Sequence, residues 1–131
     1  MFLNSGWNAL EKRRFYHFGP FRLDAVARVL LRQEDPVHLT RKAAETLLLL
    51  VERSPQVVTK EELLAGVWPD RVVDEANLTQ NIAVIRRALN SEKGEPGYIE
   101  TFPGRGYRIL GPVDLHEESP HVTTVVEPVA P

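Results

Sequence analysis

Apolar residues in the middle of the chain recur at the spacing of amphipathic helices. The first such segment is Arg41–Arg53, with Thr40 before it as a candidate N-cap and Ser54-Pro55 after it, where proline disrupts a helix. Its apolar face consists of Ala43, Ala44, Leu47, Leu48 and Val51. The run Thr59-Lys60-Glu61-Glu62 matches a capping box and predicts a second helix that ends near Trp68-Pro69.

A third helix is predicted to begin after Asp74, whose carboxylate suits the positive end of a helix. Its buried stripe recurs at positions i, i+4, i+7 and i+11 and consists of Leu78, Ile82, Ile85 and Leu89. The predicted outward face opposite this stripe consists of Asn77, Gln80, Asn81, Val84 and Arg87. Thr79 and Arg86 are expected at the flanks of that face.

Short segments rich in aromatic and β-branched residues surround the helical region and predict strands. The four that precede the helices predict a small antiparallel sheet: Phe15–Phe18, Phe21–Asp24, Arg28–Arg32 and Val37–Leu39. Two more, Tyr98–Phe102 and Tyr107–Leu110, surround Pro103-Gly104-Arg105-Gly106 and predict a hairpin whose two glycines would supply positive φ angles. The predicted fold class is α+β, in the order strands, three helices and hairpin.

These elements occupy residues 15–111, which we expect to form one domain. Residues 1–14 lack clear periodicity and are interpreted as an N-terminal arm. Residues 112–131 carry four prolines and four acidic residues but no Lys or Arg, so they are interpreted as a Pro-rich acidic linker or tail.

The charge of the chain indicates a nucleic-acid partner only through its distribution. The 131 residues carry a formal net charge of −2, but without residues 112–131 the balance is 16 basic to 14 acidic residues, a net charge of +2. Residues 77–110 have five basic and three acidic residues, again +2. This modest bias has the sign that a nucleic-acid partner needs, without indicating one by itself.

The outward face of the third helix and the hairpin together favour contact with DNA. Amides such as Gln80 and Asn81 can pair with adenine in the major groove, which admits an α-helix. Arg105 lies between glycines at the hairpin tip and can enter a minor groove, while Arg108 lies nearer the hairpin base. The helix face alone is more typical of a solvated surface, and a hairpin arginine alone is weak evidence. A polar third helix followed directly by a basic hairpin is much stronger evidence.

The sequence does not indicate a catalytic site or a metal site. The absence of cysteine excludes disulfides, thiolate metal sites and cysteine catalysis, and the four histidines are scattered along the chain. The adjacent carboxylates Glu61-Glu62 and Asp74-Glu75 begin predicted helices, where capping explains them. We therefore expect no metal, no cofactor, no small-molecule substrate and no enzymatic activity.

Several blocks of sequence carry a resemblance to a known family. The main blocks are Val67-Trp68-Pro69, Asn77-Leu78, Ile85-Arg86-Arg87-Ala88-Leu89, Tyr98-Ile99-Glu100-Thr101 and Gly104-Arg105-Gly106-Tyr107-Arg108. Through them the segment Phe18–Pro112 resembles the effector domain of the OmpR/PhoB-type winged helix-turn-helix transcriptional regulators. The resemblance implies an N-terminal four-stranded antiparallel sheet, a three-helix bundle with a helix-turn-helix and a C-terminal β-hairpin wing. It also implies a short strand at Val57-Val58 that joins the wing.

The same resemblance implies how DNA would be bound, with the third helix in the major groove and the wing at the adjacent minor groove. The implied DNA-binding residues are Asn77, Thr79, Gln80, Asn81, Val84, Arg86, Arg87, Thr101, Arg105 and Arg108. Response regulators of this type often have Arg where this chain has Pro103, so Arg105 is expected to take over the basic role. Further implied partners are RNA polymerase, at the loop Pro69–Val73, and a second copy of the domain on repeated half-sites.

The layout is similar to relatives that place the DNA-binding domain first and carry no receiver domain before it. We expect a cytoplasmic domain, tethered to a membrane if the chain continues past Pro131 into a spanning helix. The leading hypothesis is a transcriptional regulator that binds double-stranded DNA sequence-specifically. The alternative is a winged-helix protein–protein interaction module without DNA binding, which the near-neutral charge and Pro103 favour.

Overall fold

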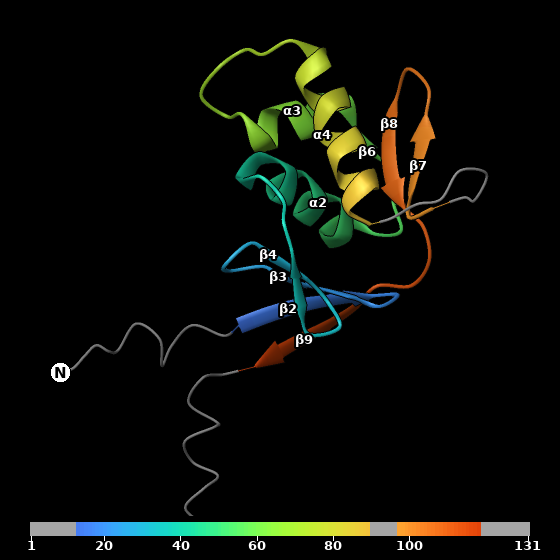
Figure 1. Cartoon of the computed structure of the whole chain (residues 1–131). Coiled ribbons are helices and arrows are strands. Elements are labelled where there is room, and N and C mark those ends of the chain that lie inside the picture. The colour runs from blue at the N-terminus through green and yellow to red at the C-terminus, as the bar shows by residue number, and fades with distance from the viewer. Residues whose placement is uncertain (1–12, 90–96, 119–131) are drawn as a thin grey trace, which may run out of the picture.

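The computed structural model describes residues 13–89 and 97–118, which form two antiparallel sheets and three helices (Figure 1). The larger sheet contains β2 (Arg13–Phe18), β3 (Phe21–Asp24), β4 (Val29–Arg32), β5 (Asp35–Val37) and β9 (Asp114–Glu118). The helices are α2 (Arg41–Arg53), α3 (Lys60–Val67) and α4 (Glu75–Ala88). The smaller sheet contains β6 (Val58–Thr59), β7 (Ile99–Phe102) and β8 (Gly106–Ile109).

The predicted four-stranded meander is confirmed, with shifted boundaries in β2, β4 and β5. The sheet has the order β5-β4-β3-β2-β9, and Phe18 pairs with Phe21 across the turn at Gly19-Pro20. Strand β2 begins at Arg13, inside the segment predicted to be an arm. Strand β5 is Asp35–Val37, earlier than the predicted Val37–Leu39; Pro36 is accommodated there because β5 pairs with β4 alone among the described residues.

A fifth strand corrects the predicted linker. Residues 112–131 were expected to lack structure, but β9 pairs antiparallel with β2, with Tyr16 opposite Leu115 and His17 opposite Asp114. The rings of His17 and His116 lie 4.2 Å apart between centroids. Because β9 is polar and pairs with residues far away in the sequence, its local pattern does not indicate a strand. The rest of the predicted linker, 119–131, and the arm 1–12 lie outside the described residues.

All three helices begin at the predicted caps. Thr40 accepts a hydrogen bond from the Ala43 N–H group, and Asp74 accepts one from the Ala76 N–H group. Thr59 and Glu62 form the predicted capping box. The backbone hydrogen bond from Thr59, with further bonds from Arg53, lowers the pKa of the Glu62 carboxyl.

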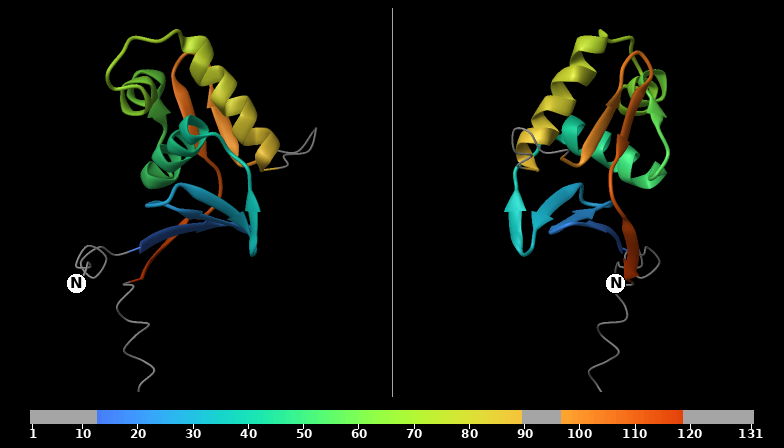
Figure 2. Two further views of the ribbon diagram at one scale, coloured as in Figure 1. Left: turned by 60° about the vertical axis from the view of Figure 1, so that its left-hand side comes forward. Right: turned by 90° about the vertical axis from the view of Figure 1, so that its right-hand side faces the viewer.

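Helix α2 lies at the centre of the fold, between the larger sheet and the other two helices (Figures 1 and 2). Leu47 and Leu50 are completely buried, and α2 packs against α3, α4 and β8. The core continues through the buried stripe of α4, where Leu78 and Ile85 are also fully inaccessible. Burial of each such side chain contributes about 1.5–3 kcal/mol, so α2 holds the sheet and α4 in one unit.

The hairpin β7–β8 is the predicted wing, and β6 joins it as the short strand expected at Val57-Val58. Val58 pairs with Tyr107, and Thr59 pairs with Gly106. Only one of the two wing glycines has the predicted positive φ: Gly104, at 74°. Gly106 is needed for another reason, because a Cβ atom there would collide with the backbone carbonyl of Val58.

Candidate nucleic-acid interface

Helix α4 lies beside the wing, as the two views of Figure 2 show. The predicted buried stripe is confirmed, since Leu78, Ile82, Ile85 and Leu89 are each at most 2% exposed. Five of the residues predicted for the DNA interface are exposed on or beside this helix face or at the wing tip: Asn77, Thr79, Gln80, Arg87 and Arg105. Val84 is half-buried and packs partly against the core.

Asn81 is not on the outward face, and the prediction that placed it there is wrong. It is 9% exposed, and its side-chain amide donates a 3.1 Å hydrogen bond to the Thr46 hydroxyl group on α2. That hydroxyl in turn donates to the Lys42 carbonyl group at 2.8 Å. Asn81 follows Leu78 by three residues and precedes Ile85 by four, a spacing that places it beside the buried stripe. The burial of Asn81 could therefore have been predicted from its spacing in the sequence.

Arg86 connects α4 to the wing. Its Nη2 atom donates to the Ile99 carbonyl group at 2.9 Å and to the Thr101 hydroxyl group at 2.8 Å. Hydrogen bonds from a charged donor are among the stronger ones in proteins. Arg86 and Thr101, both predicted to bind DNA, are therefore already bonded to each other; we call this contact the helix–wing brace.

Arg108 is also held within the protein. Its guanidinium donates to the Glu100 carboxylate at 2.9 Å on the neighbouring strand β7 and lies 5.4 Å from the centre of the Phe102 ring. The ion pair neutralises much of the positive charge at this point of the wing. The sequence indicated the basic residue, but the cross-strand pairing of Glu100 with Arg108 depends on the register of the hairpin.

Arg87 and Arg105 are the predicted cationic residues whose side chains have no bonded partner within residues 13–89 and 97–118. Arg105 is exposed at the wing tip, and its backbone is fixed at both ends. Its N–H group donates to the Phe102 carbonyl at 2.8 Å, and its carbonyl accepts from the Lys60 N–H group at 2.9 Å. The tip is therefore anchored to the start of α3 while the guanidinium stays available.

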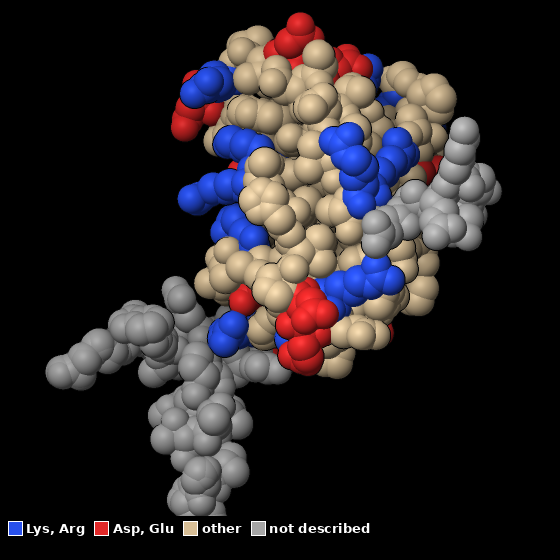
Figure 3. All heavy atoms as spheres, viewed as in Figure 1, with Lys and Arg blue, Asp and Glu red and all other residues tan. Residues whose placement is uncertain are grey.

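Charge is unevenly distributed over this face. Figure 3 shows Lys and Arg in separate groups, one of them over the lower part of α4 and the hairpin, and acidic side chains where α4 begins. Asp74 caps that helix end, and Glu75 forms a 3.1 Å ion pair with Lys60. Positive charge is thus concentrated toward the C-terminal half of α4 and the wing.

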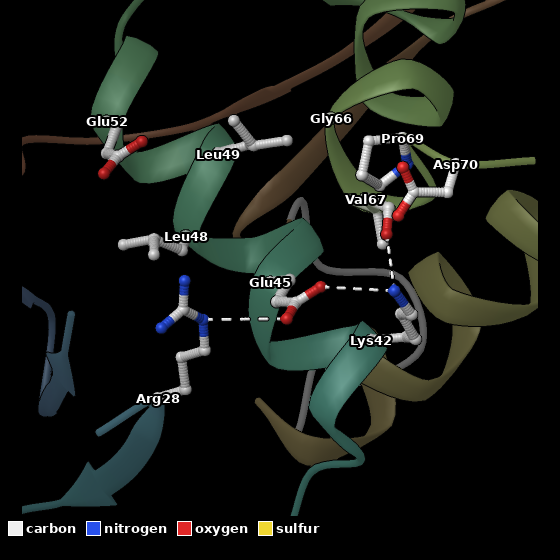
Figure 4. Close-up of a pocket in the computed structure, with 10 residues that line it drawn as sticks. All are labelled: Arg28, Lys42, Glu45, Leu48, Leu49, Glu52, Gly66, Val67, Pro69 and Asp70. Carbon is white, nitrogen blue, oxygen red and sulfur yellow. Dashed lines mark hydrogen bonds and ion pairs between the residues drawn. The ribbon is translucent and has the colours of Figure 1, made fainter. Parts of the chain in front are cut away.

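The loop between α3 and α4 borders a shallow groove of about 390 Å³ between α2 and α3. Figure 4 shows Arg28 and Lys42 both directed at Glu45, while Lys42 also donates to the Val67 carbonyl group at 2.6 Å. The loop carries Val72, which is completely exposed. The groove is lined by the basic residues Arg28 and Lys42 and by acidic residues that include Glu45, so it has no single sign of charge.

Within the described ranges, no group of three or more His, Asp or Glu side chains is arranged to hold a metal ion. None of the helices found among those residues combines the length and the apolar character needed to span a bilayer.

Residues 33–109, more than half of the chain, match the protein family described as "Transcriptional regulatory protein, C terminal". The chain is also 40% identical over 102 residues to the transcriptional regulator HilA of Salmonella typhimurium. That match covers 78% of this chain and 16% of HilA, so the chain spans a small part of this relative's length.

Solved structures of DNA-binding domains have the same fold. The DNA-binding domain of Escherichia coli CadC superposes with a TM-score of 0.70 at 24% identity, covering 81% of this chain and 100% of that one. The Thermotoga maritima response regulator DrrB, an OmpR/PhoB homolog, gives 0.67 at 34% identity, covering 74% and 44%. The Klebsiella pneumoniae RstA DNA-binding domain in complex with the RstA box gives 0.62 at 23% identity, covering 72% and 95%.

Proposed function

The chain belongs to the transcriptional regulatory proteins with an OmpR/PhoB-type winged-helix domain, and from this premise we propose that it binds double-stranded DNA sequence-specifically. Helix α4 enters the major groove, and the β7–β8 wing lies at the adjacent minor groove. The complex of the RstA DNA-binding domain, which has the same fold, with the RstA box supports DNA binding.

The observation that carries the proposal is the position of α4 beside a wing whose tip carries an exposed arginine, with no side-chain partner among the residues that the structure describes. Gln80 and Arg87 point outward from α4, and the helix–wing brace joins that helix to the strand leading to Arg105. Phosphate contacts from Arg87 and Arg105 supply affinity, while Gln80 and Asn77 supply hydrogen bonds to base edges. Asn81 has no part in this contact because its amide is buried.

A binding titration tests the proposal. Fluorescence anisotropy of the 131-residue chain with labelled genomic fragments is measured at two salt concentrations, in the presence of bulk competitor DNA. Gln80→Ala should lose about 1–3 kcal/mol on the selected fragment and little on random DNA. Arg105→Ala should weaken binding to both and reduce the salt slope by about one unit.

The matched control is Arg32→Ala, an exposed arginine of the N-terminal sheet, which should leave both the affinity and the salt slope unchanged. If no fragment binds more tightly than bulk DNA even at low salt, the domain is not a sequence-specific DNA-binding protein. That result would favour the protein-interaction alternative, which no specific contact in the described residues supports.

Two finer features belong to the same proposal. One module of this size buries little DNA surface, so two copies bind together on repeated half-sites. The α3–α4 loop, with Arg71 and the fully exposed Val72, contacts RNA polymerase. Val72→Asp should then reduce transcription from the target promoter without changing DNA affinity, and a duplex with one half-site deleted should bind more weakly than the intact duplex.

A further inference from the structure

The outward side of α4 repeats the spacing of its buried side. Each member of the buried stripe has a counterpart two residues earlier, about 200° around a helix that turns about 100° per residue. These counterparts are Ala76, Gln80, Ala83 and Arg87, and all four are exposed. We call this set the outward strip of α4. Its centre consists of Gln80 followed by Ala83 one turn later.

The chemistry of the outward strip is unusual for a surface that must meet DNA. It carries one charge, at Arg87, and two methyl groups, at Ala76 and Ala83; the half-buried Val84 adds a further apolar group beside Ala83. In the major groove, the apolar feature that base pairs present is the C5-methyl group of thymine, and alanine is among the side chains that contact it. Small side chains also allow the helix backbone to lie close to the base edges.

Resting on the proposed DNA-binding function, we infer that Ala83 contacts the C5-methyl group of a thymine next to the base pair read by Gln80. Gln80 matches adenine, because its amide donates and accepts in the pattern that the adenine N7 and N6 atoms require. Arg87 is the single member of the outward strip that can pair with guanine. The base pairs opposite the middle of α4 are therefore A·T pairs, and their orientation is set by one amide and one methyl contact.

A thymine-to-deoxyuridine scan tests this assignment, because it removes a single methyl group and leaves base pairing intact. A 20-bp duplex is first selected from a random pool by the 131-residue chain, and each thymine is then replaced in turn by deoxyuridine. At one position the wild-type chain should bind about fourfold more weakly, the ratio that corresponds to about 0.8 kcal/mol for one buried CH₂ group. Ala83→Gly should bind the thymine and deoxyuridine duplexes equally.

Two variants separate methyl contact from helix stability. Ala65→Gly introduces glycine at an exposed alanine of α3 and should retain the full fourfold response. Ala83→Ser keeps a Cβ atom and avoids the helix penalty of glycine, and should show a reduced response. Circular dichroism at the temperature of the titration checks that each variant is folded.

The outcomes distinguish this inference from the proposed function. If the selected duplex binds more tightly than random DNA but no deoxyuridine changes its affinity, the inference is overturned and the DNA-binding function remains. If Ala83→Gly and the wild type respond equally at the same thymine, another residue contacts that methyl group and the assignment to Ala83 is wrong. If no duplex is selected at all, the proposed function itself fails.

Discussion

At the scale of single residues, two neighbouring amides on α4 have different roles because they point in different directions. Gln80 is exposed, whereas Asn81 donates its hydrogen bond to Thr46 inside the helix bundle. The Asn81 amide therefore orients α4 on α2, and its partner Thr46 is completely buried. A buried polar group that loses its partner destabilises the folded state.

The first prediction compares these two amides. Asn81→Ala should lower the free energy of unfolding by about 1–3 kcal/mol, because a buried hydrogen bond is removed and a small void is left. Gln80→Ala should change it by less than about 0.5 kcal/mol, as is usual for exposed positions. Urea unfolding followed by circular dichroism measures both. If Asn81→Ala keeps full stability but loses specific DNA binding, Asn81 reads a base and its burial is not maintained in the complex.

The carboxylate of Asp24 is expected to make the stability of the larger sheet depend on pH. It is 4% exposed and accepts hydrogen bonds from the Arg13 guanidinium at 2.9 Å and from the Val26 and Ala27 N–H groups at 3.0 Å. Burial opposes its ionisation, but these hydrogen bonds outweigh burial, so the pKa of Asp24 is lowered. Its stabilising effect is present above the pKa of an unfolded carboxyl, about 3.9, and is lost as the pH falls through the lower folded pKa.

The second prediction follows from that sign. Wild-type protein should lose more stability than Asp24→Asn when the pH is lowered from 6 toward 3, while at pH 6 the variant should be the less stable of the two. Asn can still accept from the two N–H groups but cannot form the ion pair with Arg13. Urea unfolding at several pH values measures the difference. Parallel loss of stability in both proteins would show that Asp24 does not contribute to acid sensitivity.

At the scale of elements, the helix–wing brace sets α4 relative to β7. Arg86 and the adjacent Arg87 have the same charge, but Arg86 bonds to the wing and Arg87 is exposed. Arg86 therefore positions the helix against the wing, and the next residue, Arg87, is the one proposed to contact DNA. The brace is partly exposed, so its contribution is screened by solvent and is smaller than that of a buried ion pair.

The third prediction uses this pair of arginines. Arg86→Met should lower the free energy of unfolding by about 1 kcal/mol, whereas Arg87→Met should leave it unchanged and weaken DNA binding. A double-mutant cycle with Thr101→Val should give a coupling energy of about 0.5–1 kcal/mol for Arg86. Additive effects of Arg86→Met and Thr101→Val would mean that the brace does not stabilise the folded protein.

Prediction from sequence succeeded at this scale where the signal is local. Helix caps at Thr40, Thr59 and Asp74 depend on residues within one turn, and the structure confirms all three. Strand β9 depends on pairing with β2 about a hundred residues earlier, which no local pattern of its own residues encodes. At the candidate site, the outward positions of Asn77, Gln80 and Arg87 were predicted correctly, whereas Asn81 is buried and Val84 is half-buried. The exposed Ala76 and Ala83 were not predicted, because apart from Val84 the predicted DNA-binding residues were all polar or charged.

At the scale of the whole molecule, the large sheet and the proposed DNA-binding face lie in different layers. The five-stranded sheet lies on one side of α2, and α4 with the wing lies on the other (Figures 1 and 2). Strand β9 extends this sheet at β2, where Tyr16 is 8% exposed and pairs with Leu115. Changes at β9 should therefore affect folding without reaching the DNA-binding face.

The fourth prediction compares a chain that ends at Glu118 with one that ends at Pro112 and so lacks β9. Removing β9 leaves the backbone groups of β2 without their strand partner and uncovers Tyr16, so the shorter chain should melt several degrees lower; about 1 kcal/mol corresponds to about 4–8 °C in a domain of this size. Its affinity for a selected duplex, measured well below both melting temperatures, should equal that of the longer chain. Equal melting temperatures would show that β9 does not stabilise the sheet. A lower affinity at equal folded fraction would mean that the sheet itself contributes to DNA binding, and the separation of stability from DNA contact would then not hold.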